Sequence, residues 1–319
     1  MSKVAFLFPG QASQYSGMGK EFSENFASAR AVFQEADETL RFPVSRMCFE
    51  GTEEELKQTA NTQPCILAVS VAVFRGLSEH GFAPEFVAGH SLGEYSALVA
   101  AGSLSFADAI RLVRMRGTFM QEAVPAGEGA MAAILGLAPA QVSEICKRAA
   151  DGQVCSTANL NSPEQTVISG NAAAVKRAVE LASQNGAKRA VVLPVSAPFH
   201  CALMQPAQAR MEPELRKTNF ADLRVPVVTN VDAEATSSGT EARDALIRQI
   251  TSPVRWEDSV RELIEQGVTA FVEVGPGRVL SGLLRQIDRS VHSFNVEDLA
   301  SLQSAQTKFA QLRAEVGEA

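Results

Sequence analysis

The sequence predicts a large α/β domain that is interrupted by a small inserted domain. Short apolar runs alternate with helical segments over most of the chain, which favours a mostly parallel sheet covered by helices on both faces. Residues 127–195 follow a different order of strands and helices. The 319 residues suffice for one large domain with an insert, and a composition of 46% hydrophobic and 20% charged residues can bury a sizeable core.

The large domain is predicted on both sides of the insert. Val4–Phe8 is its first strand, and Phe86–Ala88 is a short strand that leads into a glycine-rich turn. Leu92–Ala101 is expected to be a helix, and a second helix begins at Ser105, a suitable N-cap, and continues to about Glu122. After the insert come strands at Val225–Thr229 and Phe271–Val274 and a helix near Leu280–Ile287.

The insert has the element order β-α-β-β-α-β, which is that of a ferredoxin-like unit. Its predicted elements are Met131–Leu135, Pro139–Ala150, Cys155–Ala158, Thr166–Ser169, Ala172–Gln184 and Arg189–Pro194. The expected boundaries are therefore residues 127–195 for the insert and residues 1–126 and 196–319 for the discontinuous large domain. The polar stretch Asp232–Glu241 is predicted to be a surface loop of the large domain.

Charge and hydropathy exclude several classes of protein. A formal net charge of −7 argues against a general attraction to nucleic acid. The longest apolar run, Ile66–Phe74, is shorter than the roughly 18 residues of a membrane span. Met1–Lys3 leads directly into the first strand with no cleavage site, so no signal peptide is expected.

The cysteines indicate a reducing compartment. They are odd in number, dispersed, and form no C-x-x-C pair: Cys48, Cys65, Cys146, Cys155 and Cys201. This pattern argues against a disulfide framework or a zinc site. We therefore expect a soluble protein of the cytoplasm that binds neither membrane nor metal.

The segment Gly89–Gly93 carries the clearest chemical signal. Its sequence, GHSLG, fits the G-x-S-x-G motif, and it lies between a predicted strand and a predicted helix, as that motif requires. Ser91 at the helix entrance would have backbone N–H groups and the positive end of the helix dipole beside it, which suits a nucleophile that forms an oxyanion. An ordinary glycine turn before a helix is the alternative.

A serine nucleophile requires a base, and His200 is the best-placed histidine. His90 is adjacent to Ser91, but the turn directs its side chain elsewhere, while His80 and His292 lie in polar surroundings. His200 follows the insert, where the chain re-enters the large domain. A capping or core histidine is the alternative.

Several sequence blocks resemble malonyl-CoA:acyl carrier protein transacylases and the acyltransferase domains of polyketide synthases. The blocks are Phe8–Gln14, Gly89–Glu94, Arg114–Gly117, Ser196–His200, Thr229–Asn230, Gln249 with Pro253–Trp256, and Glu273–Gly277. They occur in the family's order and span most of the chain. The resemblance implies an α/β-hydrolase-like large domain with a ferredoxin-like insert.

The resemblance also implies the roles of the catalytic residues. Ser91 is the acylated nucleophile and His200 its base. The backbone N–H groups of Gln11 and Leu92 form the oxyanion hole. A main-chain carbonyl near Gln249 orients the imidazole in place of an acid, and its side chain is expected to matter less than the path of its backbone.

Three residues are expected to contact the substrate: Arg116, Phe199 and Gln11, which also belongs to the oxyanion hole. By resemblance, Arg116 binds the free carboxylate of malonate, for which a guanidinium fork is well suited. On a helical projection Arg116 lies about 70° from the centre of the apolar stripe and Arg114 about 90°, so position alone does not separate them. A solvated ion pair is the alternative. Phe199 beside the base favours malonyl over methylmalonyl groups, and Cys201 is interpreted as a small packing residue.

The predicted activity is transfer of malonyl groups from malonyl-CoA to holo acyl carrier protein through a serine ester. Coenzyme A thioester is then a substrate, and no cofactor is expected. A trans-acting polyketide acyltransferase, a serine esterase or thioesterase, and a non-catalytic scaffold are the alternatives. The family suggests a monomer, and the candidates for a carrier-docking patch are Lys188, Arg189, Arg278, Arg285 and Arg289.

Overall fold

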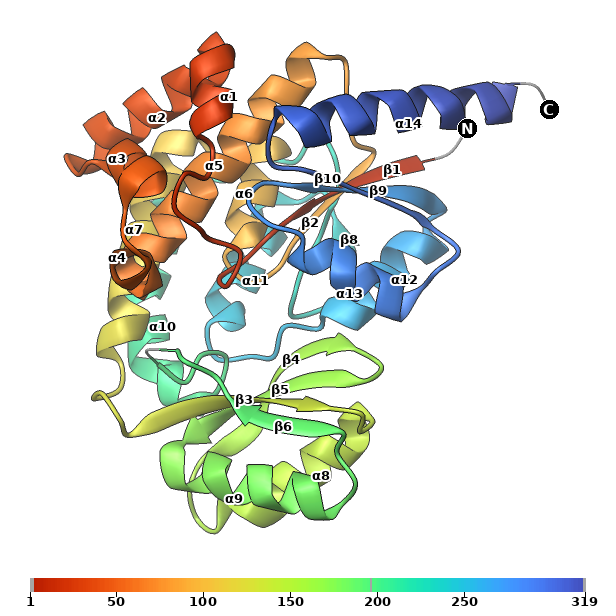
Figure 1. The fold of residues 1–319 in the computed structure, drawn as a ribbon. Coiled ribbons are helices and arrows are strands. Elements are labelled where there is room, and N and C mark those ends of the chain that lie inside the picture. Colours follow the sequence, from red (N-terminus) through yellow and green to blue (C-terminus); the bar gives the residue numbers. More distant parts are fainter. Residues whose placement is uncertain (1–2, 196, 318–319) are drawn as a thin grey trace.

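A six-stranded sheet forms the centre of the large part of the molecule (Figure 1). The computed structural model describes residues 3–195 and 197–317. The strand order is β10-β9-β1-β2-β7-β8; all neighbours are parallel except β7 and β8. The strands are β1 (Lys3–Phe8), β2 (Phe86–Gly89), β7 (Val227–Val228), β8 (Ala235–Thr236), β9 (Val268–Val274) and β10 (His292–Val296).

Alternate residues of the central strands pack on opposite faces of this sheet, because successive side chains of a strand point in opposite directions. Phe6 and Phe8 of β1 belong to one core, which also contains residues of the helices α2, α5, α6 and α7. Ala5 and Leu7 belong to a second core with residues of α12 and α13. Both faces of the sheet are therefore covered, as predicted for a parallel sheet.

The helices of the large part are distributed along the chain on both sides of the insert. They are α1 (Lys20–Asn25), α2 (Ala27–Leu40), α3 (Val44–Glu50), α4 (Glu53–Lys57), α5 (Thr59–Glu79), α6 (Gly93–Ala100), α7 (Phe106–Glu122), η1 (Ala202–Met204), α10 (Gln205–Lys217), α11 (Gly239–Gln249), α12 (Trp256–Glu265), α13 (Val279–Ile287) and α14 (Leu299–Gly317). The run Ile66–Phe74 lies inside α5, where it is mostly buried. Among the described residues, no helix is long and apolar enough to cross a membrane.

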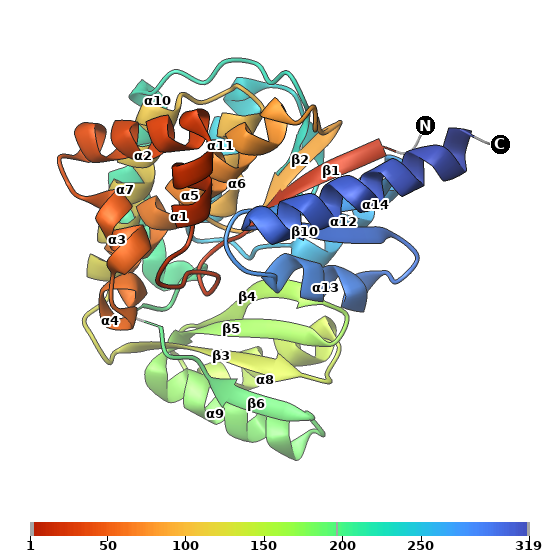
Figure 2. The same cartoon turned by 45° about the horizontal axis from the view of Figure 1, so that its top comes forward.

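A separate four-stranded antiparallel sheet occupies the middle of the sequence (Figure 2). Its order is β4-β5-β3-β6. The elements follow the predicted order: β3 (Gly129–Leu135), α8 (Pro139–Ala150), β4 (Cys155–Ser162), β5 (Gln165–Asn171), α9 (Ala172–Gln184) and β6 (Arg189–Val192).

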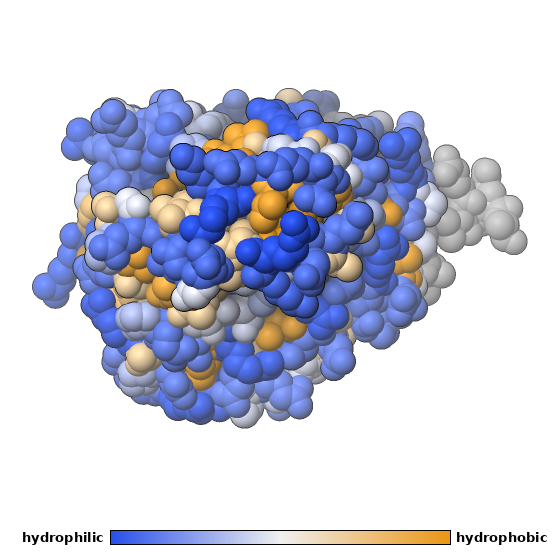
Figure 3. All heavy atoms as spheres, turned by 90° about the horizontal axis from the view of Figure 1, so that it is seen from below, coloured by the Kyte–Doolittle hydropathy of each residue, from blue (hydrophilic) through white to orange (hydrophobic). Residues whose placement is uncertain are grey.

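The two faces of this small sheet have different roles. Ala132 and Ile134 of β3 pack against α8 and α9 in a small core of their own. Met131 and Ala133, which point the other way, line a cavity toward the large part. The helices α8 and α9 lie at the bottom of Figure 1, and the molecule seen from below is mostly hydrophilic with scattered apolar side chains (Figure 3).

The prediction of a loop at Asp232–Glu241 is wrong in part. The stretch contains β8, which pairs with β7, and the first residues of α11. The side chain of Ser238 caps α11 by accepting a hydrogen bond from the backbone N–H of Glu241. A polar stretch with serine and threonine suits a helix N-terminus as well as a loop, and only the tertiary structure distinguishes the two.

Ser196, the first residue of the block Ser196–His200, lies outside the described residues.

Candidate active site

A sharp turn between β2 and α6 places Ser91 at the end of the central sheet. Ser91 has a φ of 53°, in the left-handed region that non-glycine residues rarely adopt. The glycines on either side permit this turn. A Cβ atom on Gly89 would lie 2.0 Å from the backbone of Gly93, and one on Gly93 would lie 2.1 Å from the carbonyl oxygen of Phe8. The spacing of the G-x-S-x-G motif therefore follows from close backbone packing.

Ser91, His200 and Gln249 form a continuous line of contacts. Ser91 Oγ lies 2.8 Å from His200 Nε2, and His200 Nδ1 lies 2.9 Å from the main-chain oxygen of Gln249. Because a carbonyl oxygen only accepts, Nδ1 donates to it and Nε2 is left as the acceptor for the serine hydroxyl. His200 also has a positive φ, 58°, so both contacting residues are held in an uncommon backbone conformation.

The imidazole of His200 is kept neutral. Burial lowers its pKa to about 3, and the positive charge of Arg116 contributes in the same direction. His200 is 3% exposed. A neutral imidazole beside a serine hydroxyl can accept its proton throughout the physiological pH range.

Arg116 of α7 is fully inside the molecule and points at Ser91. Its Nη2 donates to Ser91 Oγ at 3.1 Å and to the side-chain oxygen of Gln249 at 2.8 Å, and its Nη1 donates to Gln63 Oε1 at 2.9 Å. Arg116 is 1% exposed, and its Nε has no partner among the described residues. The alternative of a solvated ion pair is therefore wrong. Arg114 instead bonds to Ala60 and Asn61, away from the serine.

Ser91 opens into a cavity of about 770 Å³ between the two sheets. The large part contributes Gln11, Ser91, Arg116, Phe199 and His200, and the insert contributes Met131, Asn159, Asn161, Val167 and Leu193. Gln11 follows β1, and its side chain contacts Thr59 and Gln63. Leu92 is buried immediately after Ser91, so its backbone N–H lies at the entrance of α6.

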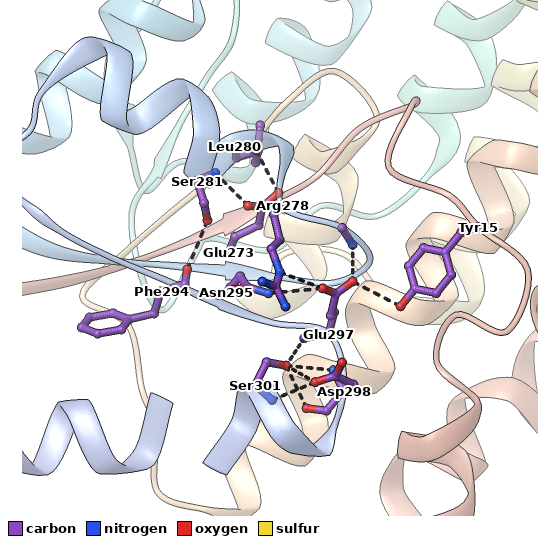
Figure 4. A network of polar contacts seen from close by, with 11 residues as sticks. Tyr15, Glu273, Arg278, Leu280, Ser281, Phe294, Asn295, Glu297, Asp298 and Ser301 are labelled. Carbon is purple, nitrogen blue, oxygen red and sulfur yellow. Dashed lines mark hydrogen bonds and ion pairs between the residues drawn. The ribbon is translucent and has the colours of Figure 1, made fainter. Parts of the chain in front are cut away.

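A network of polar contacts lies beside this cavity (Figure 4), and two of its members, Tyr15 and Leu280, line the cavity. Glu297 accepts hydrogen bonds from the Tyr15 hydroxyl at 3.2 Å, from the backbone N–H of Gly277 at 2.9 Å and from Arg278 at 3.1 Å. Glu273 accepts two further bonds from the first turn of α13, at Leu280 and Ser281. The loop that contains Tyr15 is thereby tied to the N-terminus of α13, which lines the cavity.

Two residues for which the sequence predicted no role, Asn230 and Glu94, form hydrogen bonds that hold the backbone around Ser91. The side-chain oxygen of Asn230 accepts the backbone N–H of Ser91 at 2.7 Å, and its amide donates to Gly89 at 2.7 Å. Glu94, three residues beyond Ser91, accepts from the backbone of Asn230 and from the side chain of Gln249. Both lie inside the matched blocks, but their partners are distant in sequence, so only the fold reveals their contacts.

Other candidates from the sequence lie outside the serine–histidine contact. His90 Nε2 contacts Asn161 Oδ1 at 2.9 Å and its ring packs beside Trp256, as expected for a side chain directed elsewhere. His80 and His292 are exposed. Cys201 is buried, which confirms its interpretation as a packing residue.

Residues 5–318 match the family described as acyl transferase domain. The chain belongs to the acyl transferase family. Among its relatives, the malonyl CoA-acyl carrier protein transacylase of Bacillus subtilis (strain 168) is 51% identical over 306 residues, which are 96% of each chain. The Escherichia coli (strain K12) protein of the same name is 50% identical over 90% of this chain and 93% of the relative.

Solved structures of the family have the same fold. The malonyl CoA-acyl carrier protein transacylase of Clostridium perfringens gives a TM-score of 0.95 at 40% identity, over 99% of this chain and 100% of that one. A second match is a chain in the solved structure of a type II polyketide acyl carrier protein in complex with its malonyl-transacylase. It gives a TM-score of 0.93 at 46% identity, over 95% of this chain and 99% of that one.

We expect Gly89→Ala to destabilise the protein strongly. The added methyl group would overlap the backbone of Gly93, so β2 and α6 must separate, at a cost of roughly 3 kcal/mol or more. Denaturant unfolding measures this loss. Gly282→Ala is the matched control, because among the described residues nothing beyond the neighbouring backbone of its own helix lies within 4 Å of the added Cβ. Equal stability of the two variants would contradict the close packing at the turn.

We expect Glu94→Gln to change the pH dependence of stability. Burial raises the pKa of Glu94 from 4.5 to about 7. The folded wild type therefore binds a proton that the unfolded chain releases, and loses stability as pH rises from about 4.5 to about 7. The variant lacks this loss, so its free energy of unfolding should rise relative to wild type by roughly 3 kcal/mol over that range. Parallel stability–pH curves would contradict the burial of this carboxyl group.

Proposed function

We propose that this protein transfers malonyl groups from malonyl-CoA to the phosphopantetheine thiol of holo acyl carrier protein. The observation that carries the proposal is the convergence of a neutral imidazole and a buried guanidinium on one serine hydroxyl. The imidazole can activate the serine, and the guanidinium can select an acyl group with a free carboxylate. The names of the relatives support the same activity.

The proposed reaction has two half-reactions that use the same residues. Ser91 Oγ attacks the thioester carbonyl as His200 Nε2 takes its proton, the C–S bond breaks, and the coenzyme A sulfur receives the proton. The carrier's thiol then gives its proton to His200 and attacks the malonyl-serine ester, and Ser91 Oγ leaves with that proton. Base catalysis of this kind contributes about 10²–10⁴ in rate.

The backbone N–H groups of Gln11 and Leu92 are proposed to stabilise the oxyanion in both half-reactions. Leu92 is at the entrance of α6, where the helix dipole is positive, and Gln11 lines the same cavity. Each such donor is worth roughly 10²–10³ in rate. The main-chain carbonyl of Gln249 keeps His200 in the tautomer that the reaction needs.

Substrate selection is assigned to Arg116 and Phe199. Among the described residues the Nε of Arg116 has no hydrogen-bond partner, so a donor for a malonyl carboxylate remains on a guanidinium whose Nη2 lies 3.1 Å from Ser91 Oγ. Phe199 is 7% exposed and lines the cavity, so its ring restricts the space beside the acyl group. A substituent on the α-carbon would compete with that ring, which favours plain malonyl groups.

A serine hydrolase is the second candidate from a different class. The buried carboxylate of Glu94 is available near the site, but it bonds to Asn230 and Gln249, while the imidazole bonds to a carbonyl. A hydrolase also has no need of a guanidinium at its serine. These contacts favour transfer over hydrolysis.

The proposal also covers the domain boundaries, the oligomeric state and the cellular location of the protein. We assign residues 1–126 and 196–319 to an α/β-hydrolase-like domain and 127–195 to a ferredoxin-like insert, supported by the two sheets and their element orders. The protein would act as a cytoplasmic monomer without a cofactor, in fatty-acid synthesis or with a polyketide carrier. The complex of a related transacylase with its carrier supports an acyl carrier protein as partner.

We expect Ser91→Ala to abolish transfer. Loss of the nucleophile removes the covalent route and should lower malonyl transfer to holo acyl carrier protein by roughly 10³-fold or more. Transfer is measured by mass analysis of the carrier, with circular dichroism of the variant as the control for folding. Normal turnover by a folded Ser91→Ala variant would overturn the mechanism.

We expect Arg116→Ala to reverse the acyl preference. Loss of charge-assisted bonds to the carboxylate should reduce kcat/KM for malonyl-CoA roughly 10²-fold, while acetyl-CoA is used at least as well as by wild type. Arg116→Lys is the matched control, because it keeps the positive charge but loses the planar guanidinium. Its malonyl-to-acetyl ratio of kcat/KM should lie between those of wild type and Arg116→Ala. An unchanged malonyl-to-acetyl ratio in Arg116→Ala would show that another group binds the carboxylate.

A further inference from the structure

The side chain of Gln249 links Arg116 to the residues that hold the turn at Ser91. Gln249 is the last residue of α11 and is completely buried. Its amide nitrogen donates to the Ser91 main-chain oxygen at 3.0 Å, to Glu94 Oε2 at 2.9 Å and to Asn230 Oδ1 at 3.3 Å. Its amide oxygen accepts from Arg116 Nη2 at 2.8 Å.

The ionised carboxylate of Glu94 permits only one orientation of that amide. A carboxylate accepts hydrogen bonds and a guanidinium donates them, so the NH2 group must face Glu94 and the oxygen must face Arg116. The opposite orientation would set oxygen against carboxylate and NH2 against guanidinium. Glu94 is fully buried on the first turn of α6 and is fixed there by the backbone N–H of Asn230 at 3.0 Å.

We infer that Glu94 is a positioning residue that orients the amide of Gln249 and thereby holds the guanidinium of Arg116 at Ser91. This inference rests on the proposed function, in which Arg116 binds the carboxylate of the acyl group. Glu94 touches no reacting atom; it sets the preference for a carboxylate-bearing acyl group through Gln249. Its role therefore differs from that of a buried group that only stabilises the fold.

The charge of Glu94 changes in the neutral pH range. Burial raises its pKa to about 7, while Asn230, Gln249 and the positive charge of Arg116 oppose that rise and Asp232 reinforces it. Asp232 is itself paired with Arg248 through two hydrogen bonds of 2.7 Å, so its charge stays balanced. The orienting carboxylate is thus about half formed near pH 7, more complete at higher pH and progressively lost at lower pH.

The test compares malonyl-CoA with acetyl-CoA as acyl donors. We expect Glu94→Gln to lower the malonyl-to-acetyl ratio of kcat/KM about tenfold or more, since one charge-assisted link to Arg116 is no longer held. Glu273→Gln is the matched control, because Glu273 is a second buried carboxyl group, 1% exposed, whose hydrogen bonds go to the backbone N–H groups of Leu280 and Ser281 and not to Gln249. Its ratio should equal that of wild type.

The pH profile is an independent readout. The malonyl-to-acetyl ratio of wild type should rise as pH increases from 6 to 8, and that of Glu94→Gln should stay flat. If Glu94→Gln does not fold, Gln249→Met takes its place: it keeps the main-chain carbonyl that bonds to His200 and removes only the amide. The same fall in the ratio is then expected.

Several results would overturn the inference. A parallel loss of both activities in Glu94→Gln, or the same change of ratio in Glu273→Gln, would show a purely structural role. An unchanged ratio in Glu94→Gln, where Arg116→Ala lowers it, would show that Arg116 is held without Glu94. Failure of the wild type itself to transfer malonyl groups would refute the proposed function instead, so the two failures are distinguishable.

Discussion

The site depends on the buried end of α11, because Gln249 at that end bonds both to the imidazole of His200 and to the guanidinium of Arg116. Its main-chain carbonyl accepts from His200, and its side-chain amide bonds to Arg116 and to the backbone of Ser91. A shift of α11 would therefore move the imidazole and the guanidinium together. The turn at Ser91 is held from the same side, since Asn230 accepts its backbone N–H.

Burial gives these groups their chemical properties. Removal from water keeps His200 neutral and favours the protonated form of Glu94, and it strengthens each hydrogen bond to Arg116. An unpaired guanidinium at this depth would be costly, so Gln63, Gln249 and the hydroxyl of Ser91 share its donors. Nε is the exception, since it has no partner among the described residues.

The sequence predicts what depends on local spacing and leaves open what depends on contacts between distant segments. The strand–turn–helix around Ser91 and the element order of the insert follow from short-range patterns. The burial of Arg116 does not, because a helical projection places Arg116 and Arg114 on opposite sides of the apolar stripe at similar angles from its centre, about 70° and 90°. The sequence predicts that the side chain of Gln249 matters less than the path of its backbone, yet that side chain bonds to four residues. Those contacts arise only when the end of α11 lies beside Ser91 and Glu94 in the folded chain. Glu94 had no predicted role for the same reason.

The central claim is that one serine carries the acyl group between the two thiols. It is tested most directly by mixing the protein with malonyl-CoA, stopping the reaction within seconds, and measuring intact and peptide masses. The account predicts a malonyl adduct on the peptide that contains Ser91, discharged by holo acyl carrier protein faster than by water. Absence of the adduct, or an adduct that water removes as quickly as the carrier does, would contradict it and favour a hydrolase.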